Sequence, residues 1–369
     1  MTFIQQFSGR LAVQQRVLPA YRAPFFEALA QACAGGLSVF AGQARPNENI
    51  PPAEELKSAQ YVMAKNWHFF SIQSPFYRCY QAGITQWLEA WQPEALIVEA
   101  NPRYISTPAA IRWMKRRGKL VLGWGLGALP VSGRLAGQRR NARQRFLRSL
   151  DGLIAYSQRG AEEYRSTGFP AERIFVATNA VTPRPTNPLP ERASQFQGRG
   201  RVLFVGRLQE RKRIDNLLRA CAGLPEALQP ELKVVGDGPA RSGLEALASQ
   251  VYPQAEFSGA HFGAELEGDF TKADLFVLPG TGGLAVQQAM AYGLPVIVAQ
   301  GDGTQDDLVR PENGWQVPPD DLGALQAVLE MALKDAAHLR RMGAESYRIV
   351  RDEINLERMV EVFVEALNR

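Results

Sequence analysis

The sequence is poor in the residues that build metal centres and disulfide scaffolds. Its 369 residues include only three cysteines and three histidines. The cysteines lie far apart without metal-ligand spacing, so we expect buried free thiols in a reducing cytoplasm. The histidines do not cluster, which argues against a histidine-based metal site, and we expect neither a metal nor a cofactor. These residues are Cys33, Cys79, Cys221, His68, His261 and His338.

Long apolar runs are also missing. No run approaches the roughly 20 residues of a membrane-spanning helix. The first residues, MTFIQQFSGR, lack the basic-then-apolar pattern of a secretory signal, so we expect a cytoplasmic protein. The composition is that of an ordinary globular protein, and the chain is longer than one hydrophobic core usually supports. Two domains are therefore expected.

Positive charge is unevenly distributed, although the net charge is only +5. A stretch without acidic residues holds Arg134, Arg139, Arg140, Arg143, Arg145 and Arg148. We predict a basic surface helix in this stretch, over 141–150. Such a face can bind an anionic membrane at about 1 kcal/mol per charge, and a merely solvated helix face is the alternative. Aromatic interleaving is absent, so we expect no binding of nucleic acid.

Strand and helix patterns alternate along the chain, with one break. Residues 42–75 show no clear period and are interpreted as an irregular insertion, and Phe76–Trp91 as a helix. The break at Thr182–Gly200 is rich in proline and predicts a linker. The expected organisation is an N-terminal α/β domain over 1–182, a linker over 183–200, a second α/β domain over 201–352 and a terminal helix over 353–369. Both domains fit a doubly wound fold.

The stretch Asp274–Ala299 combines a buried strand, a glycine-rich loop, an alanine-rich helix and a second strand. A glycine loop that leads into a helix N-terminus leaves backbone N–H groups free and directs a positive dipole outward. This arrangement predicts an anion site, with phosphate as the natural ligand. The alternative is that the glycines only permit close packing of strand and helix.

Three segments carry a resemblance to a known family. FVGRLQERKRIDNLL, LKVVGDGPA and LPGTGGLAVQQAMAYGLPVIVA occur in this order and resemble the C-terminal domain of glycosyltransferase family 4. These are retaining nucleotide-sugar transferases with the GT-B fold. The N-terminal segments RVLPAYRAPFFEAL, IAYSQRGAEEY and IFVATNAV are similar to bacterial members. The resemblance implies two Rossmann-like doubly wound domains facing across a cleft, with a C-terminal helix crossing back to the N-terminal domain.

The resemblance also implies a donor site in the second domain. Arg207 and Lys212, beyond the strand that ends at Gly206, match the residues that neutralise the departing diphosphate without a metal. An ordinary surface ion pair is the alternative for Arg207. Backbone N–H groups would bind the same diphosphate, and the loop that supplies them consists of Gly280, Thr281, Gly282, Gly283 and Leu284.

Three positions differ from the family pattern. Gly280 and Gln288 stand where members hold glutamates that contact the donor sugar and the ribose. Gln288 can still bond a ribose, whereas Gly280 offers only its backbone. Leu126 stands where many members hold a histidine. His261 matches a position that often holds the nucleotide base through backbone groups, and a surface histidine is the alternative.

Candidates for the acceptor side come from the N-terminal domain. Glu99 ends a predicted strand, so it faces the crevice and could position an acceptor hydroxyl. A buried ion pair with a nearby arginine, such as Arg103, is the alternative. Tyr21 and Arg22 occupy the first strand-to-helix loop, and the run that contains Gly125 and Leu126 is interpreted as a second glycine loop facing the cleft. These four residues are the further acceptor-side candidates.

The expected function is therefore the transfer of a sugar from a nucleoside-diphosphate sugar to a polysaccharide or lipid-linked acceptor. Such a reaction belongs to surface polysaccharide or lipopolysaccharide biosynthesis, at the inner face of the cell membrane. A non-catalytic relative that binds a nucleotide sugar or a partner protein is the alternative that the three departures leave open. A sugar-nucleotide epimerase lacks support, because such enzymes depend on carboxylates and histidines that this cleft does not offer.

Overall fold

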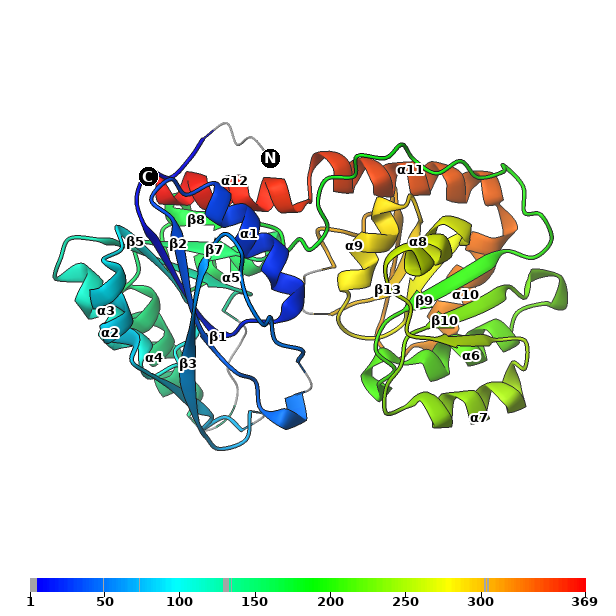
Figure 1. The fold of residues 1–369 in the computed structure, drawn as a ribbon. Coiled ribbons are helices and arrows are strands. Elements are labelled where there is room, and N and C mark those ends of the chain that lie inside the picture. Colours follow the sequence, from blue (N-terminus) through cyan, green and yellow to red (C-terminus); the bar gives the residue numbers. More distant parts are fainter. Residues whose placement is uncertain are drawn as a thin grey trace. The chain divides into compact units, whose positions relative to one another are not determined.

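The computed structural model describes residues 5–48, 50–72, 74–128, 133, 135–301, 303 and 305–369. It divides the chain into two compact units. The first contains Met1–Val181 and Leu356–Arg369, and the second contains Thr182–Asn355. Each unit is a mainly parallel β-sheet with helices on both faces (Figure 1). The predicted class of two doubly wound α/β domains is confirmed.

The sheet of the first unit has eight strands in the order β4-β3-β2-β1-β5-β6-β7-β8. All neighbours are parallel except β3 and β4. Most side chains of the central strands are buried, as expected for a sheet covered on both faces. The strands are β1 Leu11–Val17, β2 Leu37–Gly42, β3 Gln60–Phe69, β4 Arg78–Ala82, β5 Ala95–Glu99, β6 Leu120–Gly125, β7 Gly152–Ala155 and β8 Ile174–Val176.

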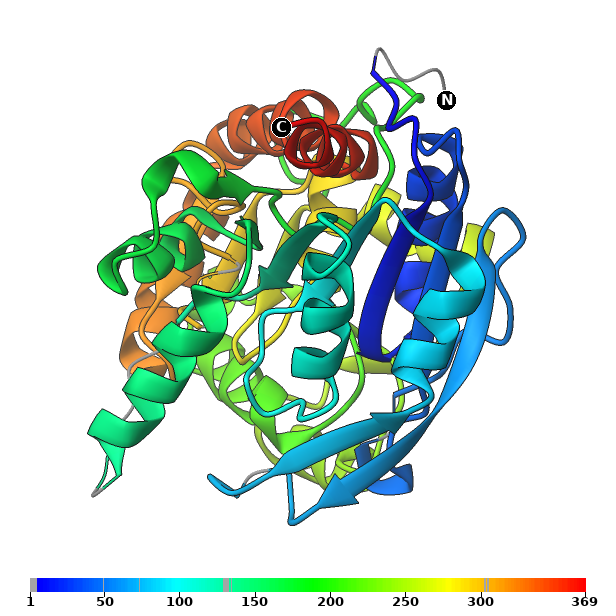
Figure 2. The ribbon, with the colours of Figure 1, turned by 90° about the vertical axis from the view of Figure 1, so that its left-hand side faces the viewer.

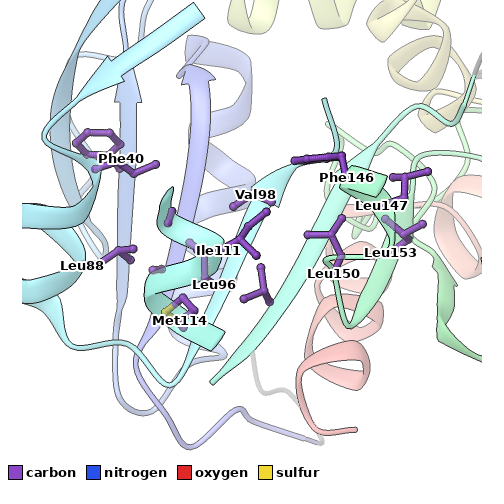
Figure 3. Packing of buried hydrophobic residues seen from close by; sticks show 14 of the residues in the cluster. Phe40, Leu88, Leu96, Val98, Ile111, Met114, Phe146, Leu147, Leu150 and Leu153 are labelled. Carbon is purple, nitrogen blue, oxygen red and sulfur yellow. The ribbon is translucent and has the colours of Figure 1, made fainter. Parts of the chain in front are cut away.

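Two sets of helices cover this sheet. Helices α2, α3, α4 and α5 contribute to a core with the strands, in which Leu96, Ile111 and Leu153 are fully or almost fully buried (Figure 3). On the other face, α1 lies beside α12. The helices are α1 Ala23–Gln31, α2 Ile84–Trp91, α3 Thr107–Lys115, α4 Ala136–Leu147, α5 Gln158–Ser166 and α12 Leu356–Leu367.

The last helix is part of the first unit, as the resemblance implied. Phe363 on α12 is fully buried and its ring lies 4.9 Å from that of Phe25 on α1. It lies 5.0 Å from the ring of Trp124 on β6, in an edge-to-face arrangement that aromatic pairs favour. An amphipathic helix far away in sequence therefore completes the core of the N-terminal domain.

The predicted irregular insertion is wrong in its second half. Residues 60–69 form the ten-residue strand β3, which pairs with β2 on one side and β4 on the other. Figure 2 shows β3 and β4 as long light-blue strands at one edge of the sheet. The predicted helix Phe76–Trp91 is wrong in its first half, because Gly83, with φ 85°, separates β4 from α2.

The sheet of the second unit has six parallel strands in the order β11-β10-β9-β12-β13-β14. This is the order of the dinucleotide-binding fold, which reverses direction between its first and fourth strands. The strands are β9 Arg201–Val205, β10 Glu231–Val235, β11 Glu256–Gly259, β12 Leu275–Leu278, β13 Val296–Ala299 and β14 Gly314–Val317. The helices are α6 Ile214–Ala222, α7 Arg241–Val251, α8 Gly263–Lys272, α9 Leu284–Ala291, α10 Leu322–Lys334 and α11 Ala336–Asp352.

The proline-rich stretch 183–200 belongs to the second unit. The guanidinium of Arg192 donates to the carbonyls of Ala273 and Phe270, at 2.9 Å each. Gln287, on α9, has a fully buried side chain that bonds both ends of the second unit. Its Oε1 accepts from the N–H of Thr182 at 3.1 Å and its Nε2 donates to the carbonyl of Ile354 at 2.7 Å. Gln287 thus joins the two ends of the unit.

Two predictions from the scarce residues can be compared with the structure. The cysteines Cys33, Cys79 and Cys221 are buried and free, as predicted. Burial raises the pKa of the Cys221 thiol to about 12, so this thiol stays protonated. No helix within the described residues is long and apolar enough to cross a membrane.

Candidate functional site

The first candidate site lies at the carboxyl ends of β9 and β12. These strands are neighbours at the point where the strand order reverses, which is where ligands bind in open α/β sheets. The chain after β9 forms a short 3-10 helix, Glu210–Lys212, and the chain after β12 forms the glycine loop before α9. The two motifs that the sequence placed far apart therefore meet at one edge of the sheet.

Gly280 lies against the backbone of the β9 loop. A Cβ atom there would lie 2.2 Å from the carbonyl oxygen of Arg211 and 2.5 Å from the carbonyl carbon of Lys212. No side chain fits this position, so the absence of the family's glutamate has a local cause in the close approach of the two loops. Neighbouring Thr281 donates its N–H to the same Arg211 carbonyl at 3.0 Å.

The prediction that the loop offers its backbone N–H groups to an anion is corrected at Thr281. That N–H is used within the protein, to join the two loops. The N–H groups of Gly282, Gly283 and Leu284 donate to no acceptor in the described part of the chain. Because Leu284 begins α9, these groups present the positive end of the helix dipole.

Lys212 is the most unusual residue of this site. Its side chain is only 8% exposed, and its amine lies 3.2 Å from a Cβ built on Gly282. Burial and, to a lesser extent, the charge of Arg211 lower its pKa to about 8. Among the described residues no acidic side chain compensates this charge. A buried amine without an anionic partner is costly, and such perturbed groups cluster at functional sites.

Arg211 was missed by the sequence analysis. Its guanidinium donates to the carbonyl of Thr281 at 3.2 Å, so it lies across the glycine loop beside Lys212. The sequence has four basic residues from Arg207 to Arg213. The resemblance to the family singled out Arg207 and Lys212. Arg207 itself is exposed, at the end of the β9 strand.

Two glycines allow the strand ends to approach each other. A Cβ on Gly236, which follows β10, would lie 1.9 Å from the carbonyl oxygen of Gly206. The backbone just before Arg207 is therefore in close contact with the backbone that follows β10. Gln288 lies half-buried on α9, one turn beyond Leu284, and its side chain forms no hydrogen bond among the described residues.

His261 is engaged with acidic side chains. Its Nδ1 lies 2.6 Å from the carboxylate of Asp269, and its Nε2 lies 3.2 Å from Glu265. Asp269 also pairs with Lys233 at 3.0 Å. The side chain of His261 is thus held in a network at the start of α8, which differs from the surface residue that the alternative described.

The second candidate site is a pocket in the first unit, with a volume of about 540 Å³. It is built by the segments that follow β5, β6 and β7, together with β4 and α4. These are carboxyl ends of parallel strands, where doubly wound sheets bind their ligands. Predicted site residues Glu99, Gly125 and Leu126 line this pocket. The glycine run at the end of β6 therefore lines a pocket, and its role in binding stays a prediction.

Glu99 is not paired with Arg103. Its carboxylate accepts from the backbone N–H of Arg16, while the side chain of Arg103 donates to Asn101 at 3.3 Å. The predicted alternative is therefore wrong for Arg103, although the charges of Arg16 and Arg22 act on Glu99. Burial raises the pKa of Glu99, and the N–H of Arg16 and the hydroxyl of Tyr104 oppose this increase.

Arg22 lies behind the wall of this pocket, and Tyr21 is exposed beside it. The Arg22 side chain is buried and its guanidinium lies 5.1 Å from the Trp124 ring and 5.5 Å from the Tyr156 ring. Its Nη1 has no hydrogen-bond partner within the described residues. Both aromatic rings line the pocket, so cation–π contacts stiffen this wall.

The predicted basic helix is α4, which begins earlier than expected, at Ala136. Arg134 lies outside the described residues. Arg139 and Arg143 are one helical turn apart and line the pocket of the first unit. Arg140 and Arg145 are exposed. Arg139 is exposed as well, so it borders the pocket from the surface, whereas Arg143 is half-buried.

Comparisons with known proteins show what the chain is similar to. Residues 189–349 match the family model described as glycosyl transferases group 1. The GDP-mannose-dependent alpha-mannosyltransferase of Mycobacterium tuberculosis (strain CDC 1551 / Oshkosh) is 30% identical over 207 residues, which cover 54% of this chain and 52% of that protein. The chain spans about half the length of the curated relatives that it matches first.

Solved structures show the same fold over almost the whole chain. The structure of Anabaena Alr3699/HepE in complex with UDP has a TM-score of 0.70 at 15% identity and covers 97% of this chain and 99% of that chain. The lipopolysaccharide outer core galactosyltransferase WaaB in its apo form has a TM-score of 0.68 at 17% identity, with the same coverage. The likeness shows that this chain has the GT-B fold.

Proposed function

We propose that this chain, whose residues 189–349 match the family model of glycosyl transferases group 1, transfers a sugar from a nucleoside-diphosphate sugar to a glycan or lipid-linked acceptor. The second unit would bind the donor at the ends of β9 and β12. The first unit would bind the acceptor in its pocket. The reaction breaks the bond between the anomeric carbon and the diphosphate, and the acceptor hydroxyl takes the place of the diphosphate.

The buried amine of Lys212 is the observation that carries this proposal. Its charge lies next to Arg211 and beside backbone N–H groups at the start of α9. Three kinds of positive group thus converge where no carboxylate balances them among the described residues. A diphosphate would neutralise all of them, and its developing charge would be stabilised as the sugar leaves.

The donor-side roles follow from this assignment. Arg207 and Lys212 would bind phosphate oxygens, with N–H groups of Gly282, Gly283 and Leu284. Gln288 could bond the ribose hydroxyls, because its amide both donates and accepts. We infer that the transfer is retaining and independent of metal ions, in line with the resemblance to family 4. We further propose that backbone groups of His261 contact the nucleotide base.

Names of related proteins support a diphosphate-bearing donor. The solved Anabaena structure is a complex with UDP, and the mycobacterial relative is named for its dependence on GDP-mannose. Both nucleotides carry a diphosphate, although their bases and sugars differ. The diphosphate that they share is the group that suits the positive charges around Lys212.

Glu99 is our candidate for handling the acceptor hydroxyl. The N–H of Arg16 binds the carboxylate and fixes its position at the pocket wall. A raised pKa brings a carboxylate closer to the pH at which it can accept a proton from a hydroxyl. Tyr21 and Arg22 would support the acceptor from the neighbouring loop, while Gly125 and Leu126 border it.

A cytoplasmic location at the inner face of the cell membrane is part of the proposal. The exposed arginines of α4, such as Arg140 and Arg145, could bind anionic lipid. The name of the lipopolysaccharide galactosyltransferase that shares this fold is compatible with surface polysaccharide or lipopolysaccharide biosynthesis.

A donor panel tests the proposal. The full-length protein is incubated with UDP-, GDP- and ADP-sugars and a bacterial membrane extract, and release of nucleoside diphosphate is measured. We expect acceptor-dependent release with one donor class, and loss of release in Lys212→Met but not in Lys272→Met, which removes an exposed lysine at the end of α8. Nucleotide binding without release would favour the non-catalytic alternative. Absence of both would overturn the donor site.

A further inference from the structure

Four arginines and one carboxylate are the charged residues that line the pocket of the first unit. The arginines come from three separate elements: Arg78 from β4, Arg103 from the segment after β5, and Arg139 and Arg143 from α4. Burial lowers the pKa of Arg143; the charges of Arg139 and Arg103 act in the same direction, and Tyr164 and Glu163 act against it. Like charges are thus gathered at close quarters, and a bound anion would stabilise this arrangement.

Backbone hydrogen bonds bring two of these arginines together. Cys79 on β4 donates its N–H to the carbonyl of Arg103 at 3.1 Å and accepts from the N–H of Ile105 at 2.9 Å. Arg78 precedes Cys79 directly, so the Arg103 segment runs along the free edge of β4. Neither Arg78 nor Arg103 forms an ion pair with any residue that the structure describes.

The carboxylate of the pocket does not neutralise the arginines. Glu99 accepts the backbone N–H of Arg16, and the charges that act on it come from Arg16 and Arg22. Both of these arginines lie outside the set that lines the pocket. The pocket therefore keeps an excess of positive charge.

An aromatic surface adjoins the pocket. Odd-numbered residues of β3 face solvent, and among them Trp67 is 50% exposed and Phe69 is similarly exposed. Across the strand pair, Trp67 lies opposite Tyr80 and Phe69 lies opposite Arg78. Phe70 and Phe76 are also exposed, with ring centroids 6.3 Å apart. Exposed aromatic clusters of this kind mark interaction surfaces.

Arg78 joins the two features. It lies opposite Phe69 in the strand pair and also lines the pocket, as does Pro75, the neighbour of Phe76. Lys65 stands on the same exposed side of β3, with its amine 4.7 Å from the Trp67 ring. Aromatic rings interspersed with cations match the headgroup region of a bilayer, where tryptophan and tyrosine are enriched.

We propose that the acceptor is a membrane-anchored phosphate ester: its phosphate or diphosphate binds among Arg78, Arg103, Arg139 and Arg143 while the aromatic face of β3 and β4 rests on the lipid surface. Planar guanidinium forks bind phosphate oxygens in pairs, which explains why arginine rather than lysine fills the pocket. This inference rests on the proposed function, because it identifies the substrate class of the same acceptor site.

Binding of the full-length protein to vesicles tests the inference. Three vesicle types are compared by cosedimentation: phosphatidylcholine alone, phosphatidylcholine with a polyprenyl phosphate, and phosphatidylcholine with phosphatidylglycerol at matched surface charge. The wild-type protein should bind the polyprenyl phosphate vesicles at least about tenfold more tightly than the charge-matched vesicles, which is what one charge-assisted hydrogen bond supplies.

The variants separate the pocket from the aromatic face. Arg103→Gln and Arg143→Gln should lose the tenfold preference, whereas Arg112→Gln removes an exposed charge from α3 and should keep it. The double variant Trp67→Ser, Phe69→Ser should weaken binding to every vesicle. Circular dichroism confirms that each variant is folded.

Two results would overturn the inference. Equal binding to both anionic vesicle types would show that the pocket does not recognise a phosphate ester. Tight binding of a water-soluble sugar phosphate, unchanged by the Trp67 and Phe69 substitutions, would replace the lipid with a soluble acceptor. Binding of nucleoside diphosphate, followed by thermal shift, should be retained in all these variants. Its absence from the wild-type protein would contradict the proposed function instead.

Discussion

Replacing Lys212 by methionine should stabilise the protein and weaken its binding of nucleoside diphosphate at the same time. Burial lowers the pKa of Lys212 from its ordinary value of 10.5 to about 8. At neutral pH the protein therefore holds a charged amine in a place that disfavours the charge. Methionine has a similar length and no charge, so it relieves the burial cost and removes the group that attracts the phosphate.

The magnitude follows from the lowered pKa. Between pH 8 and 10.5 the unfolded chain holds the Lys212 proton more tightly than the folded chain, so wild-type stability rises with pH across this window. Below pH 8 the full cost is present. A pKa difference of about 2.5 corresponds to about 3 kcal/mol, which is the upper limit for the gain in unfolding free energy on substitution.

The affinity for nucleotide should fall as the pH rises, whereas the stability of the wild-type protein increases. Only the protonated amine attracts the diphosphate, and the free protein loses this proton around pH 8. The affinity of the wild-type protein should therefore fall about tenfold between pH 7 and pH 9, since each pH unit above the pKa removes most of the charged form. The Lys212→Met protein should bind more weakly and show no such slope.

Two measurements on the same samples decide this prediction. Denaturant unfolding at pH 7 and pH 10 gives the free energies of unfolding, and titration calorimetry gives the affinities for UDP, GDP and ADP. Lys272→Met is the matched control, because this exposed lysine should change neither quantity. A methionine variant that is less stable than the wild type at pH 7, or nucleotide affinity without pH dependence, would refute the reasoning about Lys212.

Three further substitutions test other parts of the account. Arg207→Ala should weaken nucleotide binding by about 1.5–3 kcal/mol and lower turnover by about two to three orders of magnitude, with little change in melting temperature; unaltered affinity would remove Arg207 from the site. Gly280→Ala should cost about 1–3 kcal/mol of stability because its Cβ would meet the Arg211 carbonyl, whereas Gly268→Ala, in open space on α8, should cost nothing. Phe363→Ala should destabilise the first unit by about 3–5 kcal/mol in denaturant unfolding, and a loss below about 1 kcal/mol would contradict the packing of α12.

Much of the fold could be predicted because buried parallel strands have an unmistakable pattern. Short apolar runs such as those of β5 and β12 end at polar or glycine-rich turns, and amphipathic helices follow them. The terminal helix predicted within 353–369 is observed as α12, Leu356–Leu367, since its apolar face repeats at helical spacing. In such elements the spacing of apolar residues in the sequence indicates which face is buried.

The elements that were missed bury little. Strand β3 leaves its aromatic side chains in solvent, so its alternation does not separate apolar from polar residues. Helix α8 buries only Asp269 and Phe270, so its sequence has no apolar repeat that would predict a helix. Strand β14 is four residues long and begins at a glycine. In each case the neighbouring strand or helix, rather than the local pattern, fixes the structure.

The candidate site could be predicted only in part for a related reason. The sequence indicated the glycine loop and the basic segment after β9, and the structure joins them through Thr281 and Arg211. It could not reveal that Lys212 is buried while Arg207 is exposed, because burial depends on the other loop. The arginines of the pocket come from separate elements, so their convergence is a property of the fold alone.

A structure of the protein with a bound nucleoside diphosphate tests the central claim most directly. The account predicts that the diphosphate lies at the ends of β9 and β12, with its oxygens within hydrogen-bond distance of the Lys212 amine and of N–H groups among Gly282, Gly283 and Leu284. Density for the diphosphate elsewhere in the protein, with the Lys212 amine still unpaired, would contradict the account.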